Sequence, residues 1–201
     1  MKELDPSQVA ITSGYWQLRL EMNAKEALSP QWEQLEKSGA IDNFRLLAEG
    51  KPGFREGWFF ADSDAYKWLE AASRAYALHP SEKLAERIDS FVALIGAAQE
   101  EDGNLYTYNQ IHFPGVRWTN LQIEHELYCH GHLIEAGVSH YEATGQHLLL
   151  EIAEKVANLL VREFLETGPE RTPGHQEIEI ALMRLYRATG KDPYLALAEH
   201  S

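Results

Sequence analysis

The sequence predicts an all-α protein assembled from αα-hairpins. Apolar residues recur at helical spacing from about Tyr15 onward, whereas alternating runs of valine, isoleucine and threonine are nearly absent. A helix-ending tract also repeats, since Tyr-Glu-Ala-Thr-Gly at 141–145 returns as Tyr-Arg-Ala-Thr-Gly at 186–190. Glycine suits the left-handed conformation that closes a helix, so each tract predicts a stop followed by an antiparallel partner. Repeated hairpins of this kind build either a solenoid or an α/α barrel.

Four apolar stripes give predicted helices in chain order. The first follows Asp62 and Ser63, either of which can cap its free amides, and it ends before Pro80. The third follows Gly145, and the fourth runs into Gly190. A short stretch at 105–108 is the one segment predicted to be extended. The stripes comprise Tyr66, Leu69, Ala72 and Tyr76; Leu84, Ile88, Phe91, Val92 and Ile95; Leu149, Ile152, Ala153, Val156 and Leu160; and Ile178, Ala181, Leu182 and Leu185.

Composition bounds the class of protein. The chain has 201 residues, 44% of them hydrophobic, which predicts a single folded helical domain over residues 1–201. Its net charge of −13 argues against nucleic-acid and membrane partners, because both are bound through clustered lysine and arginine. The longest apolar run, 91–98, is too short to span a bilayer, and the amino terminus has no apolar signal segment. With one cysteine, Cys129, these features predict a cytoplasmic location.

The segment 101–119 interrupts the helical rhythm. Long loops inside compact helical domains often carry function. Aromatic rings beside polar groups suit the two faces of a sugar, although the same rings could simply fix the loop to the core. The aromatic and histidine residues of the segment are Tyr106, Tyr108, His112, Phe113 and Trp118.

The tract 125–132 holds the densest cluster of reactive side chains. If it is helical, His125, Cys129 and His132 lie one above another on one face. Thiolate and imidazole suit zinc, but the zinc-protease signature requires histidine where this chain has Cys129. We therefore favour packing or substrate hydrogen bonding over a metal site. His130 points elsewhere and is expected in solvent or in a polar contact.

A second cluster begins at the Pro173-Gly174 turn, which leads into a helix. His175 lies at the start of this helix, near free backbone amides, where its side chain can meet a ligand hydroxyl. The alternative is that His175 or Gln176 only caps the helix. Three carboxylates stay open as candidates for acid–base chemistry: Glu126, Glu135 and Glu177.

Five tracts occur in an order that carries a family resemblance. They are Asn43-Phe44-Arg45, DSDAYKWLEA at 62–71, AQEEDG at 98–103, HELYCHGHLIEA at 125–136 and PGHQEIEIAL at 173–182. Together they resemble the β-L-arabinofuranosidase family, glycoside hydrolase family 127, from about Val9 to the last residue. The resemblance implies an (α/α)6 barrel, which agrees with the hairpin repeat. It also implies a retaining hydrolase that releases L-arabinofuranose from β-linked arabinosides.

The same resemblance implies how such enzymes react. A cysteine thiolate in a zinc site made by cysteines and a glutamate attacks the anomeric carbon, and another glutamate acts as acid and base. That cysteine cluster is absent here, and Cys129 belongs to a different motif. We therefore expect no catalytic residue and no zinc in this chain. The expectation is an amino-terminal portion of such an enzyme, truncated, split or expressed as a fragment, which self-associates or pairs with the missing carboxy-terminal half.

The resemblance further implies a sugar-binding role for the chain, with an L-arabinofuranoside as its ligand. His125 and His175 match histidines that contact the substrate, and Gln31 matches a glutamine that contacts the sugar. Tyr128, one helical turn from His125, is expected to border the same pocket. Asp102 is expected at its rim.

Two other hypotheses stay open from the sequence. One is a stand-alone helical module that binds carbohydrate or serves as a scaffold, without catalysis. The other is a metal held by the tract 125–132 for structure or for another hydrolysis.

Overall fold

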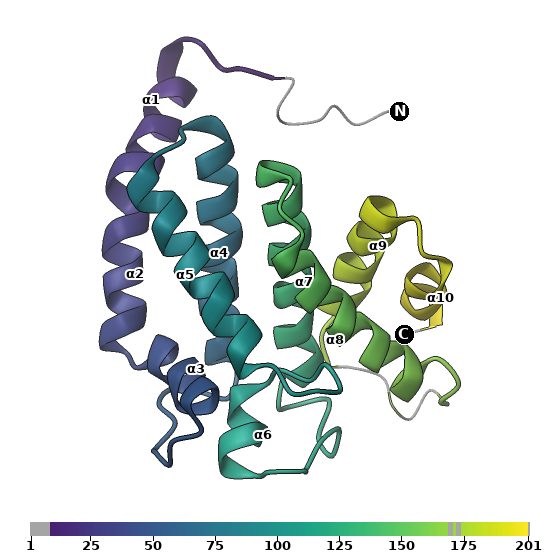
Figure 1. Cartoon of the computed structure of the whole chain (residues 1–201). Helices are drawn as coiled ribbons and strands as arrows, with labels where there is room; N and C mark the ends of the chain where they lie inside the picture. The colour runs from purple at the N-terminus through teal and green to yellow at the C-terminus, as the bar shows by residue number, and fades with distance from the viewer. Residues whose placement is uncertain (1–8, 169–170, 172–173, 201) are drawn as a thin grey trace.

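The computed structural model describes residues 9–168, 171 and 174–200. Pro173, the first residue of the expected turn, lies outside these described residues. Within them the regular elements are helical, as predicted, and Figure 1 shows their arrangement. In chain order they are α1 (Gly14–Met22), the π-helical η2 (Asn23–Ala27), α2 (Leu28–Lys37), α3 (Ala40–Glu49), α4 (Ala61–Leu78), α5 (Glu82–Ala98), α6 (Thr107–His112), α7 (Glu126–Thr144), α8 (Leu148–Phe164), α9 (Glu177–Thr189) and α10 (Asp192–His200).

Stacked αα-hairpins form the main body. α4 packs against α5, α7 against α8, and α9 against α10. The first helices of these hairpins also contact one another, α4 with α7 and α7 with α9, while α5 and α10 both contact α8. The hairpins therefore build two layers, with α4, α7 and α9 in one and α5, α8 and α10 in the other. In Figure 1 the helices of the first layer all run upward from their first residues.

The repeated tracts end their helices as predicted. α7 ends at Thr144 and α9 at Thr189, and the glycine that follows each has a φ of 71°. Glycine adopts this left-handed conformation without the strain that a side chain would add. α4 ends at Leu78, before the proline at position 80.

The four predicted stripes all contribute to one hydrophobic core. Aromatic rings fix α2 to it, since Trp32 lies 4.5 Å from Trp68 and 5.3 Å from Phe91 between ring centroids. Phe44 does the same for α3, with its ring 5.6 Å from that of Phe91. The indole N–H of Trp68 donates to the carbonyl of Leu28 at 2.9 Å. A buried indole with its polar atom paired combines apolar burial with a satisfied hydrogen bond.

A buried ion pair joins the segment before α4 to α6. The side chains of Arg55 and Asp62 are both fully buried, and Nη2 of the arginine lies 3.1 Å from Oδ1 of the aspartate. The Asp62 carboxylate also accepts from the backbone N–H of Thr107 at 2.7 Å and from its hydroxyl at 2.6 Å. Burial raises the pKa of Asp62, and the charge of Arg55 opposes that shift.

Two local predictions around these segments are wrong. Neither Asp62 nor Ser63 caps α4, because the helix begins at Ala61 and both side chains are buried in its first turn. The stretch predicted to be extended, 105–108, already enters α6 at Thr107. In both cases the polar side chains are held by distant parts of the chain, which sequence spacing does not reveal.

His130 also differs from the prediction. It is fully buried, its ring lies 6.5 Å from that of Tyr106 and 5.7 Å from that of Trp118, and neither ring nitrogen has a hydrogen-bond partner. Burial lowers the pKa of His130 to about 3, so the ring is neutral at pH 7. It serves as a packing residue rather than as a solvated one.

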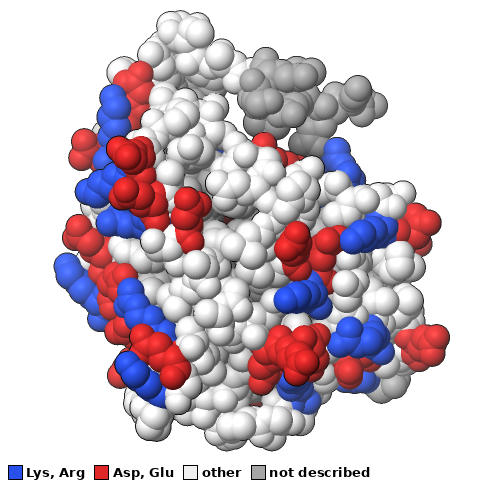
Figure 2. All heavy atoms as spheres, in the orientation of Figure 1, with Lys and Arg blue, Asp and Glu red and all other residues white. Residues whose placement is uncertain are grey.

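Charged side chains of both signs are mixed on the surface. On the face that Figure 2 shows, lysine and arginine lie next to aspartate and glutamate and do not gather into a basic patch. Arg45, for example, lies 2.7 Å from Glu36 and 2.5 Å from Asp42. Among the described residues, none of the helices combines the length and the apolar character that crossing a membrane requires.

Candidate sugar-binding site

The first-layer helices begin close together, and the predicted histidines lie at two of these starts. His125 is the residue immediately before α7, and His175 lies two residues before α9. The His125 ring is 6.3 Å from the His175 ring and 5.9 Å from that of Phe60, which precedes α4. Segments far apart in the sequence thus meet at one end of the layer.

His125 has an unusual backbone conformation. Its φ is 57°, in the left-handed region that few side chains adopt. Its Nδ1 lies 2.7 Å from the carbonyl oxygen of Ile123. A carbonyl can only accept, so Nδ1 carries the hydrogen, and in the neutral ring Nε2 is then a hydrogen-bond acceptor.

In His175 the two ring nitrogens have the opposite hydrogen-bonding roles. Its Nδ1 accepts from the backbone N–H of Glu177 at 3.1 Å, which leaves Nε2 with the hydrogen and makes it a donor. Gly174 allows the approach of this segment, because a Cβ at that position would collide with the backbone of Gln122. The close contact explains why His175 lies beside the start of α7. His175 is exposed and His125 half-buried.

Tyr128 forms the wall between the two histidines. Its ring lies 5.3 Å from His125, 4.6 Å from His175 and 4.5 Å from His132. The Tyr128 hydroxyl accepts from Nζ of Lys67 at 2.8 Å, so its own hydrogen is free for another acceptor. These three side chains therefore offer one acceptor, two donors and a flat aromatic face.

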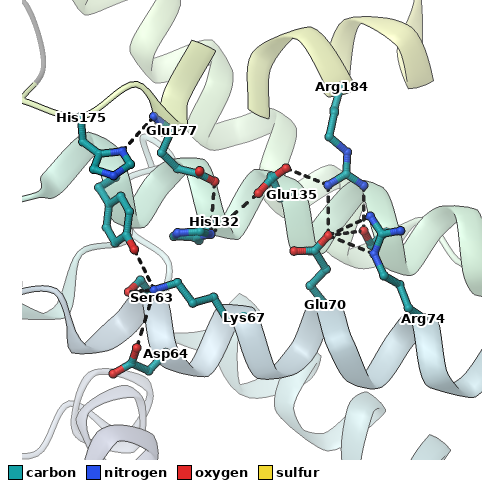
Figure 3. A network of polar contacts seen from close by, with 12 residues as sticks. Ser63, Asp64, Lys67, Glu70, Arg74, His132, Glu135, His175, Glu177 and Arg184 are labelled. Carbon is teal, nitrogen blue, oxygen red and sulfur yellow. Dashed lines mark hydrogen bonds and ion pairs between the residues drawn. The ribbon is translucent and has the colours of Figure 1, made fainter. Parts of the chain in front are cut away.

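A partly buried polar network supports these side chains from α4, α7 and α9 (Figure 3). His132 Nδ1 lies 3.2 Å from a Glu177 oxygen and 3.8 Å from Glu135. Burial lowers the pKa of His132 to about 4, so these contacts involve a neutral ring at pH 7. Arg184 continues the network, with Nη1 lying 2.8 Å from Glu135 and 3.0 Å from Glu70.

Glu177 holds a proton within this network. Burial, together with the hydrogen bond to Glu135, raises the pKa of Glu177 to about 8. One of the two carboxyl groups is therefore protonated at pH 7, because two adjacent carboxylates with little solvent do not both ionise. The backbone N–H of Glu177 in turn donates to His175, which links this carboxyl pair to the histidine.

Metal-ligand chemistry is present in this network, but not in the group of residues that the metal hypothesis left open by the sequence would use. Within the described residues, the ligand atoms of His132, Glu135 and Glu177 all lie within 4.8 Å of one another and could hold a divalent cation. His125, Cys129 and His132 do not form such a group. The reason is that α7 begins after His125, whose ring turns toward Phe60 instead of following the helical stripe.

Cys129 does not fit a zinc–thiolate site. It is fully buried, and its Sγ lies 3.7 Å from the carbonyl oxygen of Phe60. Burial raises the pKa of the thiol well above its usual range, which favours the protonated sulfur over the thiolate that binds zinc. We assign no chemical step to zinc in this chain.

Two predicted site residues lie outside the cluster. Gln31 is exposed on α2, and the ring contacts and hydrogen bonds that join His125, Tyr128 and His175 do not include it. Asp102 uses its carboxylate to hold Arg117, with Oδ2 2.6 Å from Nη1. Asp102 therefore shapes the long loop.

Lys67 is the contact that the sequence interpretation missed. It belongs to the quoted tract 62–71, yet its role depends on Tyr128, which lies 61 residues further along the chain. Helical spacing gave no signal for that pairing. The tract itself was the available signal, because it places Lys67 one turn after Ser63, whose hydroxyl accepts from Nζ at 3.2 Å.

Comparisons with known proteins agree with this picture. The family model described as β-L-arabinofuranosidase, GH127 catalytic domain, matches residues 8–200. A non-reducing end β-L-arabinofuranosidase of Bifidobacterium longum is 36% identical over 96% of the chain. Among solved structures, a GH127 β-L-arabinofuranosidase from Geobacillus stearothermophilus T6 superposes over 95% of the chain with a TM-score of 0.89 and 38% identity. A second solved GH127 β-arabinofuranosidase superposes over 96% of the chain with a TM-score of 0.87 and 35% identity.

These matches also define how much of the architecture is present. The chain spans 33% of the Bifidobacterium protein and 32% of each of the two solved chains, about a third of their length. Those enzymes have an (α/α)6 barrel, and the stacked hairpins described here correspond to a part of it.

Proposed function

The chain belongs to the β-L-arabinofuranosidase family, glycoside hydrolase family 127, and on that premise we propose that it binds a β-linked L-arabinofuranosyl group between His125, Tyr128 and His175. The observation that carries the proposal is the opposite polarity of the two histidines. His125 offers an acceptor nitrogen and His175 a donor N–H, with ring centroids 6.3 Å apart. A sugar hydroxyl both donates and accepts, so neighbouring hydroxyls can bond to both rings at once.

Tyr128 adds orientation to this binding. Its hydroxyl already accepts from Lys67, which leaves its hydrogen to donate to a sugar oxygen. Its ring offers an apolar face to the C–H groups of the sugar. The buried network of His132, Glu135 and Glu177 holds these groups in place before the ligand arrives, which reduces the entropy lost on binding.

We further propose that this chain alone turns over no substrate. The retaining mechanism of the family requires an activated cysteine nucleophile, and the thiol of Cys129 is buried and protonated. The chain's own residues bind and orient the sugar, while the nucleophile and the acid–base glutamate lie outside it. A stand-alone sugar-binding module without catalysis would use the same three side chains. An assay for turnover distinguishes an active enzyme from either inactive alternative, the enzyme portion or the module.

The test is calorimetric titration of the purified 201-residue chain with L-arabinose. Three variants remove the proposed contacts: His125→Asn, His175→Ala and Tyr128→Phe. Asparagine is chosen at position 125 because it tolerates the left-handed backbone. His79→Ala, at an exposed position after α4, is the matched control.

We expect each histidine variant to weaken binding by about tenfold or more, equivalent to about 1.4 kcal/mol for one lost hydrogen bond, and the control to bind as the parent does. Equal affinities for the parent and the histidine variants, or no binding by the folded parent, would contradict the proposal. Release of arabinose from an arabinofuranoside by this chain, lost on Cys129→Ser, would contradict the assignment of Cys129 as inert.

A further inference from the structure

An exposed aromatic surface lies beside the sugar-binding site. Trp58 is 72% exposed and Phe54 is 74% exposed, both in the segment between α3 and α4. Large rings that project into water lose the stabilisation that burial would give them. An exposed tryptophan next to a ligand pocket is therefore a candidate binding residue.

The segment that carries Trp58 is firmly held. The fully buried Arg55 donates from Nη1 to the carbonyl oxygens of Gly57 at 2.9 Å and of Trp58 itself at 2.6 Å. Its Nη2 is anchored by Asp62 at 3.1 Å. The backbone carbonyls thus point inward, and the indole ring is left on the outside of a fixed turn. Trp58 is presented to solvent by the fold rather than by a loose loop.

The exposed ring is continuous with the sugar site. Trp58 and Phe60 are parallel, with 3° between their planes and 6.5 Å between their centroids. The Phe60 ring is in turn 5.9 Å from His125. One half-buried ring therefore separates the exposed indole from the histidine that contacts the arabinofuranosyl group.

We propose that Trp58 binds a second sugar ring, the one to which the arabinofuranosyl group at His125 and His175 is linked. This inference rests on the proposed function. A flat indole face fits the C–H face of one sugar ring, and the stacked Phe60 connects the indole to His125. The carbonyls of Gly57 and Trp58 are already occupied by Arg55, so the turn offers few main-chain groups to a peptide. A carbohydrate is the occupant that this surface suits.

The experiment compares two ligands on the 201-residue chain: L-arabinose and a disaccharide of β-linked L-arabinofuranose. Calorimetry gives the affinity of each for the parent, for Trp58→Ala and for Trp58→Phe. Trp16→Ala is the matched control, because Trp16 is 66% exposed on α1. Circular dichroism establishes that each variant is folded.

We expect the disaccharide to bind about 3- to 10-fold more tightly than L-arabinose. Trp58→Ala should remove that gain and leave the affinity for L-arabinose unchanged, Trp58→Phe should keep part of it, and Trp16→Ala should keep all of it. If the parent binds both ligands equally, or if Trp58→Ala keeps the gain, the inference about Trp58 is overturned while the histidine site stands. If neither ligand binds, the proposed function and this inference are both overturned.

Discussion

Replacing Arg55 with methionine tests the buried ion pair most directly. Methionine keeps much of the length and the apolar stem of arginine, but it removes the charge beside Asp62 and the donors to the carbonyls of Gly57 and Trp58. Removing one partner of a fully buried pair leaves the other charge uncompensated, which costs about 3–5 kcal/mol. For a domain whose total stability is about 5–15 kcal/mol, such a loss is severe.

The penalty has a predictable pH dependence. Burial already raises the pKa of Asp62, and without Arg55 only the two hydrogen bonds from Thr107 oppose that shift. A carboxyl group with a raised pKa binds more protons when folded than when unfolded, so stability falls as pH rises through the range between the unfolded and folded pKa values. The difference between Arg55→Met and the parent should therefore be smaller at pH 4 than at pH 7.

The assay is urea denaturation followed by circular dichroism at both pH values. Asp62→Asn in the Arg55→Met background removes the stranded charge, and we expect it to recover about 2 kcal/mol at pH 7. A loss below about 1 kcal/mol, or a double variant no more stable than the single one, would refute the reasoning that Asp62 is ionised and uncompensated.

Two further predictions concern the contact between α7 and α9. Glu177→Gln removes a group whose pKa is raised to about 8. As pH rises from about 4.5 to 8, the free energy of unfolding of the parent should therefore fall by about 1–2 kcal/mol relative to the variant, after allowance for screening by water. An equal pH dependence of stability in the two proteins would contradict this expectation. Gly131→Ala would place a Cβ 2.7 Å from Cγ of Glu177, so we expect the free energy of unfolding, measured by chemical denaturation, to fall by about 1–3 kcal/mol. Gly96→Ala is the control, because its Cβ meets only the flexible end of Ile152, and it should be neutral or slightly stabilising.

Most of the fold could be predicted from the sequence, because helical periodicity is a local property. The stripes of α4, α5, α8 and α9 and the stops at Gly145 and Gly190 all follow from residues within a few turns of one another. The wrong predictions have long-range causes. Asp62 looks like a cap in the sequence, yet its partners are Arg55 and Thr107, and burial with them outweighs the local preference for capping.

The candidate site was predictable in composition and not in geometry. The motifs placed His125, Tyr128 and His175 together, but helical spacing also placed His125 on a face with Cys129, which its left-handed backbone rules out. The family resemblance was correct, while the sugar contacts of all five residues stay predictions: His125, His175, Tyr128, Gln31 and Asp102. Which ring nitrogen of each histidine carries the hydrogen depends on backbone atoms two residues away, and motif matching does not include these atoms.

The stacking of the hairpins has a consequence for how binding and folding are coupled. α9 and α10 form the last hairpin, and their main contacts outside it are with α7 and α8. His175 precedes that hairpin and His125 precedes the one before it, so a sugar held by both spans a boundary between neighbouring folding units. The ligand should therefore slow the amide hydrogen exchange of α9 and α10 more than that of α4, because it binds only while the last hairpin is docked.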